Sequence, residues 1–230
     1  MGLESGSHKV KKEILRVYRS RKETRSFYDK ISRIYDLLAE RSEKPARAAG
    51  LKVLSPMPGE KLLEIGPGTG RCLALMAAAA TPKGRVYGID LSEGMLKKAR
   101  EALHRLRLDD GVQLISGDAT SLPFLAATMD GIFMSFTLEL FDTPDIPEVL
   151  AECRRVLRPD GRMVVVGMSK EGQTSALVRA FEWTHRHFPS ILDCRPIYVR
   201  RALEAAGFRI IIAQAQKMWI SVEIVLARMK

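Results

Sequence analysis

The feature that most constrains the fold is a regular alternation of short apolar segments and longer amphipathic segments between residues 61 and 167. Short apolar runs that end at glycine predict buried strands, and apolar residues at helical spacing predict helices. Alternating strands and helices form parallel sheets whose two faces the helices cover. The sequence therefore predicts a doubly wound α/β fold. Strands are expected over 61–66, 85–90, 112–118, 130–136 and 162–167, and helices over 71–80, 92–108 and 147–158.

The end of the chain departs from this alternation. A helix expected over 202–208 is followed by two apolar strands, 209–216 and 218–228, with almost no linker between them. Two strands so close in the sequence must pair as an antiparallel hairpin, because parallel strands require a longer crossover. The expected sheet therefore has seven strands, is mostly parallel and ends in an antiparallel strand.

The beginning of the chain is expected to be helical and basic. Residues 9–25 carry eight basic and two acidic side chains, with apolar residues at helical spacing, and residues 26–40 continue that spacing. Prolines and a glycine at 56–59 then end this section. We therefore expect a helical extension over residues 1–50 and a single α/β domain over residues 51–230.

The strongest local motif is the glycine-rich turn that follows the first expected strand. Gly66, Gly68 and Gly70 alternate with other residues, and Glu64 precedes them. Nicotinamide dinucleotides are bound by GxGxxG, and the position of its third glycine is held here by Arg71. An acidic side chain beside the turn suits a ligand with positive charge rather than a pyrophosphate. A tight turn without any ligand is the alternative.

Two further acidic side chains follow the next two expected strands. Asp90 ends the second strand, 20 positions after Gly70, where an acid can accept hydrogen bonds from ribose hydroxyls. Asp118 ends the third strand, where a carboxylate can accept the amine of an adenine. Each acid could instead cap the helix that follows it. With Glu64, however, three acids stand at the carboxyl ends of successive parallel strands, which is the ligand-binding edge of such sheets.

Five segments together resemble the class I S-adenosylmethionine (SAM)-dependent methyltransferases. They are LLEIGPGTG, GIDLSEGML, SGDATSLPF, MDGIFMSFTLELF and LRPDGRMVVVG, and they cover residues 61 to 167 in the order of that family. The resemblance implies a Rossmann-like sheet with strand order 3-2-1-4-5-7-6 and SAM as the cofactor. It places the three glycines beneath the cofactor, Glu64 near its amino acid moiety, Asp90 at the ribose, and Asp118 with Ala119 at the adenine. Residues of the same motifs complete the predicted cofactor site: Leu91, Met95 and Ser135.

Within that class, the chain most resembles the ubiquinone/menaquinone-biosynthesis C-methyltransferases and related small-molecule enzymes. One mark is the doubled Tyr-Asp pattern at Tyr28 and Tyr35, which implies a lid whose tyrosine touches the carboxylate end of the cofactor; aromatic core packing is the alternative. The segment around Arg195-Pro-Ile is instead similar to bacterial phospholipid N-methyltransferases. The expected activity is therefore methyl transfer to a small lipophilic acceptor, quinone-like or lipid, with phospholipid amine methylation as the alternative.

Methyl transfer is a direct displacement that depends mainly on holding the acceptor in line with the methyl group. Carbon and oxygen acceptors also benefit from a general base. The candidates for that base are His185, His187 and Glu139, with Asp142 behind them, although a lone histidine more often lies on the surface. The expected substrate residues are Tyr35, Trp183, Arg195 and Tyr198, each of which could instead serve core packing or an ion pair.

The charge of the chain bears on its partners. The net charge of +10 divides into +6 for residues 1–50 (13 − 7), −3 for residues 51–150 (10 − 13) and +7 for residues 151–230 (14 − 7). Basic residues 9–25 are expected to contact an anionic membrane surface if the acceptor is a lipid. Nucleic acid is not expected, because Tyr18 is the one aromatic side chain among these basic residues.

Three scattered cysteines, Cys72, Cys153 and Cys194, favour a reducing compartment and predict no metal site. The first residues contain no apolar signal-peptide core. The expected location is cytoplasmic, with peripheral contact to a membrane. A rival of another class is a non-catalytic SAM-binding module associated with a membrane or RNA.

Overall fold

The computed structural model describes residues 14, 16–17, 20–31, 40–171, 195–218 and 220–230. Its described strands form one sheet of seven in the order β3-β2-β1-β4-β5-β7-β6. Strand β7 is antiparallel to both of its neighbours, and the remaining pairs are parallel. This confirms the predicted fold and strand order. The strands are β1 (Lys61–Ile65), β2 (Arg85–Asp90), β3 (Val112–Ser116), β4 (Met129–Ser135), β5 (Leu157–Met168), β6 (Phe208–Lys217) and β7 (Ser221–Met229).

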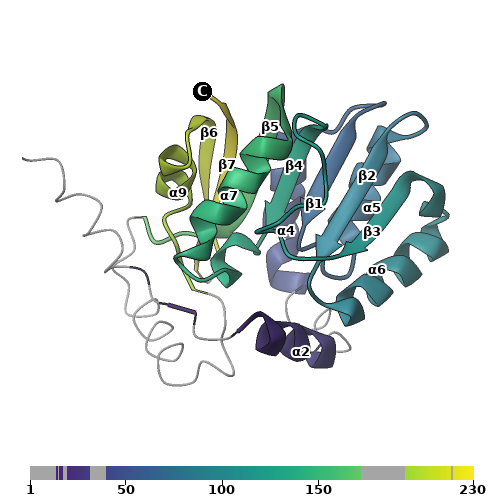
Figure 1. Ribbon diagram of the computed structural model, residues 1–230, viewed down its shortest axis with the longest axis horizontal. Coiled ribbons are helices and arrows are strands. Elements are labelled where there is room, and N and C mark those ends of the chain that lie inside the picture. The colour runs from purple at the N-terminus through teal and green to yellow at the C-terminus, as the bar shows by residue number, and fades with distance from the viewer. Residues whose placement is uncertain (1–13, 15, 18–19, 32–39, 172–194, 219) are drawn as a thin grey trace, which may run out of the picture.

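Helices cover both faces of the sheet. Buried side chains of α4, α5 and α6 belong to the apolar cluster on one face, and those of α7 and α9 belong to the cluster on the other. Figure 1 shows α7 in front of the sheet and α4 behind it. The described helices are α2 (Arg21–Ile31), α4 (Glu40–Leu54), α5 (Arg71–Ala80), α6 (Glu93–Leu106), α7 (Asp145–Val156) and α9 (Val199–Ala205), with short 3₁₀ turns η1 (Asp109–Gly111) and η2 (Leu138–Leu140).

Local signals explain where several of these elements begin and end. The Ser92 hydroxyl accepts a hydrogen bond from the Met95 amide at 3.1 Å, which is an N-cap for α6. Helix α5 begins after Gly70, whose φ of +83° is a left-handed conformation that glycine adopts readily. A Cβ atom at Gly70 would lie 2.8 Å from the Cβ of Ala99. Glycine at this position therefore lets α5 and α6 approach closely.

The N-terminal helix begins later than expected. Residues 14, 16, 17 and 20 are not helical, so the prediction of a helix over 9–25 is wrong at these positions, and α2 begins at Arg21. A capping box explains the start. The Glu23 amide donates to the Ser20 hydroxyl at 3.3 Å, and the Glu23 carboxylate accepts from the Ser20 amide at 2.8 Å. Figure 1 shows α2 beyond one edge of the sheet, next to α6.

Helix α4 lies mostly within the helical extension expected over residues 1–50, although its own bounds were not predicted. It contains Pro45, and it packs against β4, β5 and β7. A Cβ atom at Gly50 would lie 2.3 Å from Cγ2 of Val166, so glycine permits this close approach to the sheet. The expected boundary between residues 50 and 51 falls inside this helix.

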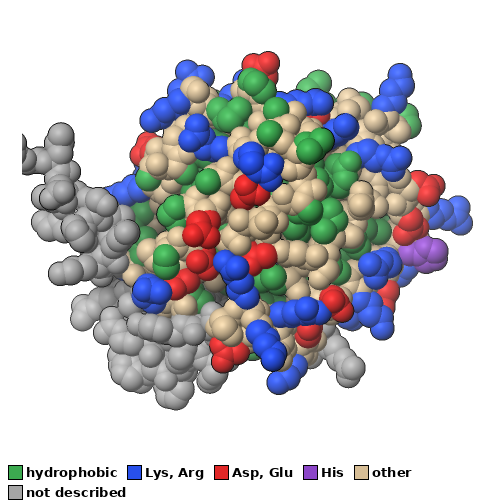
Figure 2. All heavy atoms as spheres, viewed as in Figure 1, with side chains coloured by type: hydrophobic (Ala, Val, Ile, Leu, Met, Phe, Trp, Pro, Cys, Tyr) green, Lys and Arg blue, Asp and Glu red, His purple; other side chains and the backbone are tan. Residues whose placement is uncertain are grey.

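Basic and acidic side chains are interspersed over the face of the molecule that Figure 2 shows. Within the part of the chain that the structure describes, no helix is both long and apolar enough to cross a membrane.

Candidate cofactor site

A cavity lies at the carboxyl ends of β1, β2, β3 and β4, with about 1160 Å³ of empty space, part of it open to solvent. Its walls come mainly from the turns that follow these four strands and from α2, with single side chains of α4, α5, α6 and α7 and that of Val17. Ligand pockets commonly enclose about 300–1,000 Å³, so the space suits a small organic ligand. Its position is the edge at which open α/β sheets bind ligands.

The glycine-rich turn forms the floor of the cavity. Gly66 and Gly68 have φ values of +68° and +54°, which strain any other residue. A Cβ atom at Gly66 would lie 2.5 Å from the Thr137 side chain, whereas one at Gly68 would meet no described atom within 4 Å. The backbone at Gly68 thus faces open space, where a ligand can approach it closely.

Glu64 is a buried acid in this cavity and is 2% exposed. Its Oε2 atom and the hydroxyl of Ser135, which also lines the cavity, have no hydrogen-bond partner among the described residues. Burial raises the pKa of Glu64 to about 8, although the positive charge of Arg47 opposes the rise. Buried polar groups are normally satisfied, so these two groups fit a ligand that supplies hydrogen-bond donors.

Asp90 and Asp118 occupy the next two strand ends. The carboxylate of Asp90 accepts hydrogen bonds from the amides of Ser92 at 2.9 Å and Gly68 at 3.3 Å. Burial raises the pKa of Asp90 to about 6, against these hydrogen bonds. Asp118 accepts from the amide and hydroxyl of Thr120, both at 2.9 Å. The two carboxylates are thus held in place by local backbone contacts, and both face the cavity.

The N-terminal residues lie over this cavity and are held there by ion pairs. Arg16 contacts Asp142 at 2.6 Å, and Arg21 contacts Asp118 at 2.8 Å. Further along α2, Asp29 accepts hydrogen bonds from the Ser92 hydroxyl at 2.6 Å and the Gly94 amide at 2.9 Å. We call the described residues 16–17 and 20–31 the strap. Sequence analysis identified Tyr28 in this strap but none of its ion pairs.

The cavity brings together most of the predicted cofactor residues. Those that line it are Tyr28, Glu64, Gly66, Gly68, Asp90, Leu91, Met95, Asp118, Ala119 and Ser135. Gly70 lies outside the lining and instead marks the beginning of α5. Tyr35, Trp183, His185 and His187 lie outside the described residues.

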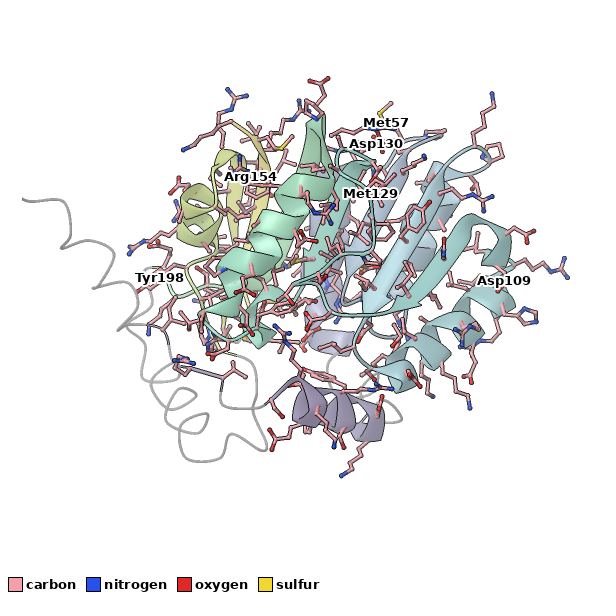
Figure 3. The ribbon with its side chains drawn as sticks, viewed as in Figure 1. Met57, Asp109, Met129, Asp130, Arg154 and Tyr198 are labelled. Atoms are coloured by element: carbon pink, nitrogen blue, oxygen red, sulfur yellow. The ribbon has the colours of Figure 1, made fainter. Side chains whose placement is uncertain are left out.

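Glu139, Arg195 and Tyr198 do not belong to the lining of this cavity. The Glu139 carboxylate is buried and accepts a hydrogen bond from the Met168 amide at 3.0 Å, and burial raises its pKa to about 7. Arg195 is 1% exposed and donates to the Glu139 carbonyl at 2.5 Å. Tyr198 lies under the guanidinium of Arg201, 4.3 Å from its ring centre, and Figure 3 shows it beside α9. Arg195 thus supports the η2 turn that forms part of the cavity wall.

Sequence analysis missed other lining residues. Val17, Phe136, Leu140 and Phe141 form an apolar part of the wall, and Arg47 reaches the cavity from α4. Phe136 has a φ of +53°, which is uncommon for a bulky residue and more frequent at functional sites. Phe136, Leu140 and Phe141 belong to the segment MDGIFMSFTLELF, which carried a signal in the sequence, whereas Val17 and Arg47 reach the cavity through chain packing. The described residues hold no cluster of three or more potential metal ligands.

Comparison with known proteins agrees with this geometry. Residues 62–161 match a family model described as a methyltransferase domain. A demethylmenaquinone methyltransferase of Symbiobacterium thermophilum is 38% identical over 113 residues, which is 49% of this chain and 44% of that protein. The chain spans between 44% and 61% of the length of the demethylmenaquinone methyltransferases that it matches.

One relative and two solved structures match more of the chain. The nocamycin O-methyltransferase of Saccharothrix syringae is 36% identical over 201 residues, covering 79% of this chain and 70% of the relative. A SAM-dependent methyltransferase of Aquifex aeolicus has a TM-score of 0.61 at 25% identity, covering 80% of this chain and 89% of that one. The [4+2]-cyclase SpnF shares the fold, with a TM-score of 0.72 at 16% identity, covering 92% and 97%. The chain covers more than two thirds of the nocamycin O-methyltransferase and also matches the methyltransferase family model. We therefore conclude that this chain belongs to the class I SAM-dependent methyltransferases.

Proposed function

We propose that the protein transfers the methyl group of SAM to a small, lipophilic acceptor. The observation that carries this proposal is the mixed lining of the cavity. The glycine-rich turn and the acids Glu64, Asp90 and Asp118 line it together with apolar side chains, among them Phe136 and Phe141. The glycine-rich turn and the acids suit a polar cofactor, and the apolar side chains suit an apolar acceptor.

The chemical groups of SAM can be matched to the polar side chains of the cavity. Glu64 accepts hydrogen bonds from the ammonium group of the amino acid moiety, which satisfies its buried Oε2 atom. Asp90 accepts the ribose hydroxyls, and Asp118 with Ala119 lies at the adenine. Because the Asp118 carboxylate is also paired with Arg21 of the strap, the adenine amine must share or displace that contact. When bound, SAM supplies a methyl group on a positively charged sulfur.

The contribution of the protein to the reaction is mainly positional. The strap covers the cavity and limits the access of water, while the apolar wall holds the acceptor near the methyl group. Asp142 lies at this wall, but it is a poor base. Burial alone would raise its pKa, yet hydrogen bonds from Arg16, Val17 and Thr143 lower it below its ordinary value. Glu139 faces Met168 and would need a rearrangement of η2 to reach an acceptor.

The names of the relatives support a lipophilic acceptor, but they do not identify the acceptor of this protein. One is called a demethylmenaquinone methyltransferase and another a nocamycin O-methyltransferase, so their names cover different acceptors, and the second name specifies transfer to oxygen. Phospholipid amine methylation remains the alternative. The segment around Arg195 favoured this alternative, but the Arg195 side chain is buried and donates to the Glu139 carbonyl, so it does not line the cavity. SpnF, named as a cyclase, has the same fold, so cofactor binding and methyl transfer require separate tests.

The first test is a transfer assay with SAM that carries a labelled methyl group. The protein is incubated with this SAM and total cell extract, and the mixture is partitioned between organic and aqueous phases. Label in the organic phase supports the proposal, and mass spectrometry of the labelled compound separates a quinone-like acceptor from a phospholipid. Label in water alone overturns the lipophilic acceptor, and RNase treatment then separates RNA from a polar metabolite.

An Asp90→Asn variant provides the control for that assay. It keeps the shape of the side chain but removes the charge that is expected to accept two ribose hydroxyls. Affinity for S-adenosylhomocysteine, measured by calorimetry, should fall about 10-fold or more, since hydrogen bonds to charged groups contribute about 1.5–3 kcal/mol. Wild-type protein that binds S-adenosylhomocysteine but transfers no label would favour the non-catalytic binding module.

A further inference from the structure

The loop from Glu139 to Thr143 carries part of the apolar wall of the cavity. Leu140 and Phe141 of this loop line the cavity together with Asp142. Beyond η2 the loop belongs to no helix or strand, so no regular hydrogen-bond pattern sets its position. The proposed acceptor lies against this loop, and its fit therefore depends on the contacts that hold the loop in place.

One buried arginine holds both ends of this loop. Arg195, which is 1% exposed, donates from Nη1 to the Glu139 carbonyl at 2.5 Å and from Nη2 to the Thr143 hydroxyl at 3.3 Å. These two partners precede the arginine by 56 and 52 positions in the chain. A guanidinium presents several donors in a fixed planar fork, so one side chain can hold two points of a loop at once.

The arginine is itself anchored to the end of β5. Two residues further along, the Ile197 amide donates to the Met168 carbonyl at 3.0 Å, and the Ile197 carbonyl accepts from the Lys170 amide at 3.0 Å. The Met168 amide donates to the Glu139 carboxylate at 3.0 Å. Met168 thus binds the loop through its amide and the segment that follows Arg195 through its carbonyl. These contacts form a closed circuit of hydrogen bonds that joins the loop to the sheet.

Arg195 reaches the loop from behind the cavity wall. It does not belong to the lining, so a ligand in the cavity does not touch it. Burial of a guanidinium costs free energy, and apolar side chains of similar volume often stabilise a core at least as well. What an arginine provides, and an apolar side chain does not, is a set of directed hydrogen bonds. The residue therefore suits a positional role better than a purely stabilising one.

We propose that Arg195 is a positioning residue for the methyl acceptor. By holding Glu139 and Thr143, it sets the place of Leu140 and Phe141, and thereby the distance of an apolar acceptor from the methyl group. This inference rests on the proposed function, because it requires an acceptor that lies against this part of the wall. The cofactor should be affected little, since the glycine-rich turn and the acids follow β1, β2 and β3, whereas Arg195 binds the loop after β4.

The test separates cofactor binding from use of the acceptor. An Arg195→Met variant keeps the length of the side chain but removes its donors. Its affinity for S-adenosylhomocysteine, measured by calorimetry, should stay within about twofold of wild type. Its rate of methyl transfer at limiting acceptor, measured with labelled SAM and an organic extract of cells, should fall about 10- to 100-fold, because a small misplacement of the reacting groups causes a loss of this size.

Two further substitutions at known positions control this comparison. Arg195→Lys should recover part of the transfer rate, since it restores one donor but not the planar fork. Arg209→Met should change neither the affinity nor the rate, because it removes an exposed arginine from β6.

A double-mutant cycle shows whether Arg195 acts through the loop. Thr143→Val removes one of the two hydrogen bonds, so the transfer rate should fall about 2- to 5-fold in wild type and by almost nothing further in Arg195→Met. Additive losses would overturn the assignment, as would an unchanged rate in Thr143→Val, which tests the contact even if Arg195→Met does not fold. Equal losses of cofactor affinity and transfer rate in Arg195→Met would also overturn it, because they indicate a general structural role. Wild-type protein that transfers no label to the organic extract would refute the proposed function, and this inference with it.

Discussion

Binding of S-adenosylhomocysteine at neutral pH is expected to release the proton that the free protein holds on Glu64. Burial raises the pKa of this carboxyl from 4.5 to about 8, and Arg47 only partly offsets the effect. At pH 7 about nine tenths of the free protein therefore carries the proton. A bound ammonium group stabilises the ionised carboxylate, so the ligand and the proton compete. Affinity should rise with pH, by about tenfold per unit, until pH 8.

Calorimetry at pH 7 in buffers with different ionisation enthalpies measures the proton count directly. Wild-type protein should release about 0.9 proton per ligand, as a pKa of about 8 requires. The charged or titratable groups that interact with Glu64 are Arg47 on α4, Cys72 on α5 and Asp90 on β2. Asp90, with a pKa of about 6, adds its own dependence mainly below pH 6.

A Glu64→Gln variant isolates the contribution of this carboxyl. The amide cannot titrate, so the variant should bind with lower affinity and release almost no proton, and its affinity should be level between pH 6.5 and 8. A wild-type protein whose binding enthalpy does not depend on the buffer would refute the reasoning. Proton release that persists unchanged in Glu64→Gln would show that another group is its source.

Three further outcomes follow from the contacts. Between pH 4.5 and 8 the folded state holds a proton on Glu64 that the unfolded state gives up, so the free energy of unfolding of the wild type falls as pH rises. In urea unfolding at pH 7, the Glu64→Gln variant should therefore be more stable than wild type by about 3 kcal/mol. Near pH 4.5 the two proteins should be equally stable. Gly50→Ala should lose about 1–3 kcal/mol in the same assay despite a better helix former, because its Cβ would overlap Val166; equal stability would contradict this. Asp142→Asn removes the carboxylate that binds Arg16, so stopped-flow should detect S-adenosylhomocysteine leaving about 2- to 5-fold faster, and an unchanged rate would exclude a retaining role for the strap.

The elements predicted most accurately are those whose signals are local. The bounds of α5 and β2 agree with the sequence pattern at both ends. A strand that ends in glycine and a helix that follows it are determined by residues adjacent in the chain. The same holds for Glu64, Asp90 and Asp118, because parallel strands bring their carboxyl ends to one edge of the sheet. Pattern and topology together were therefore sufficient to predict the acidic side of the cavity.

The bounds of helix α4 could not be predicted from local sequence signals. Pro45 interrupts its pattern, and its stability depends on packing against β4, β5 and β7, which lie later in the sequence. Without α4 on the sheet, nothing indicates that Arg47 reaches the cavity. The start of α2 is a different case, since the capping box from Ser20 to Glu23 is a local signal that the sequence contains, and it places the first helical residue at Arg21.

The sequence by itself determined the strands, the glycine-rich turn and the acids at the carboxyl edge of the sheet, because these depend on periodicity and on short-range motifs, and the family resemblance implied the strand order. The tertiary structure decided which distant side chains join them. Arg16 and Asp142 are separated by 126 positions, yet their ion pair helps to place the strap over the cavity. Arg195 was expected at a substrate and instead supports the Glu139 carbonyl from within the core. A polar side chain acts on a ligand or on its own backbone according to where packing places it, and no local pattern contains that information.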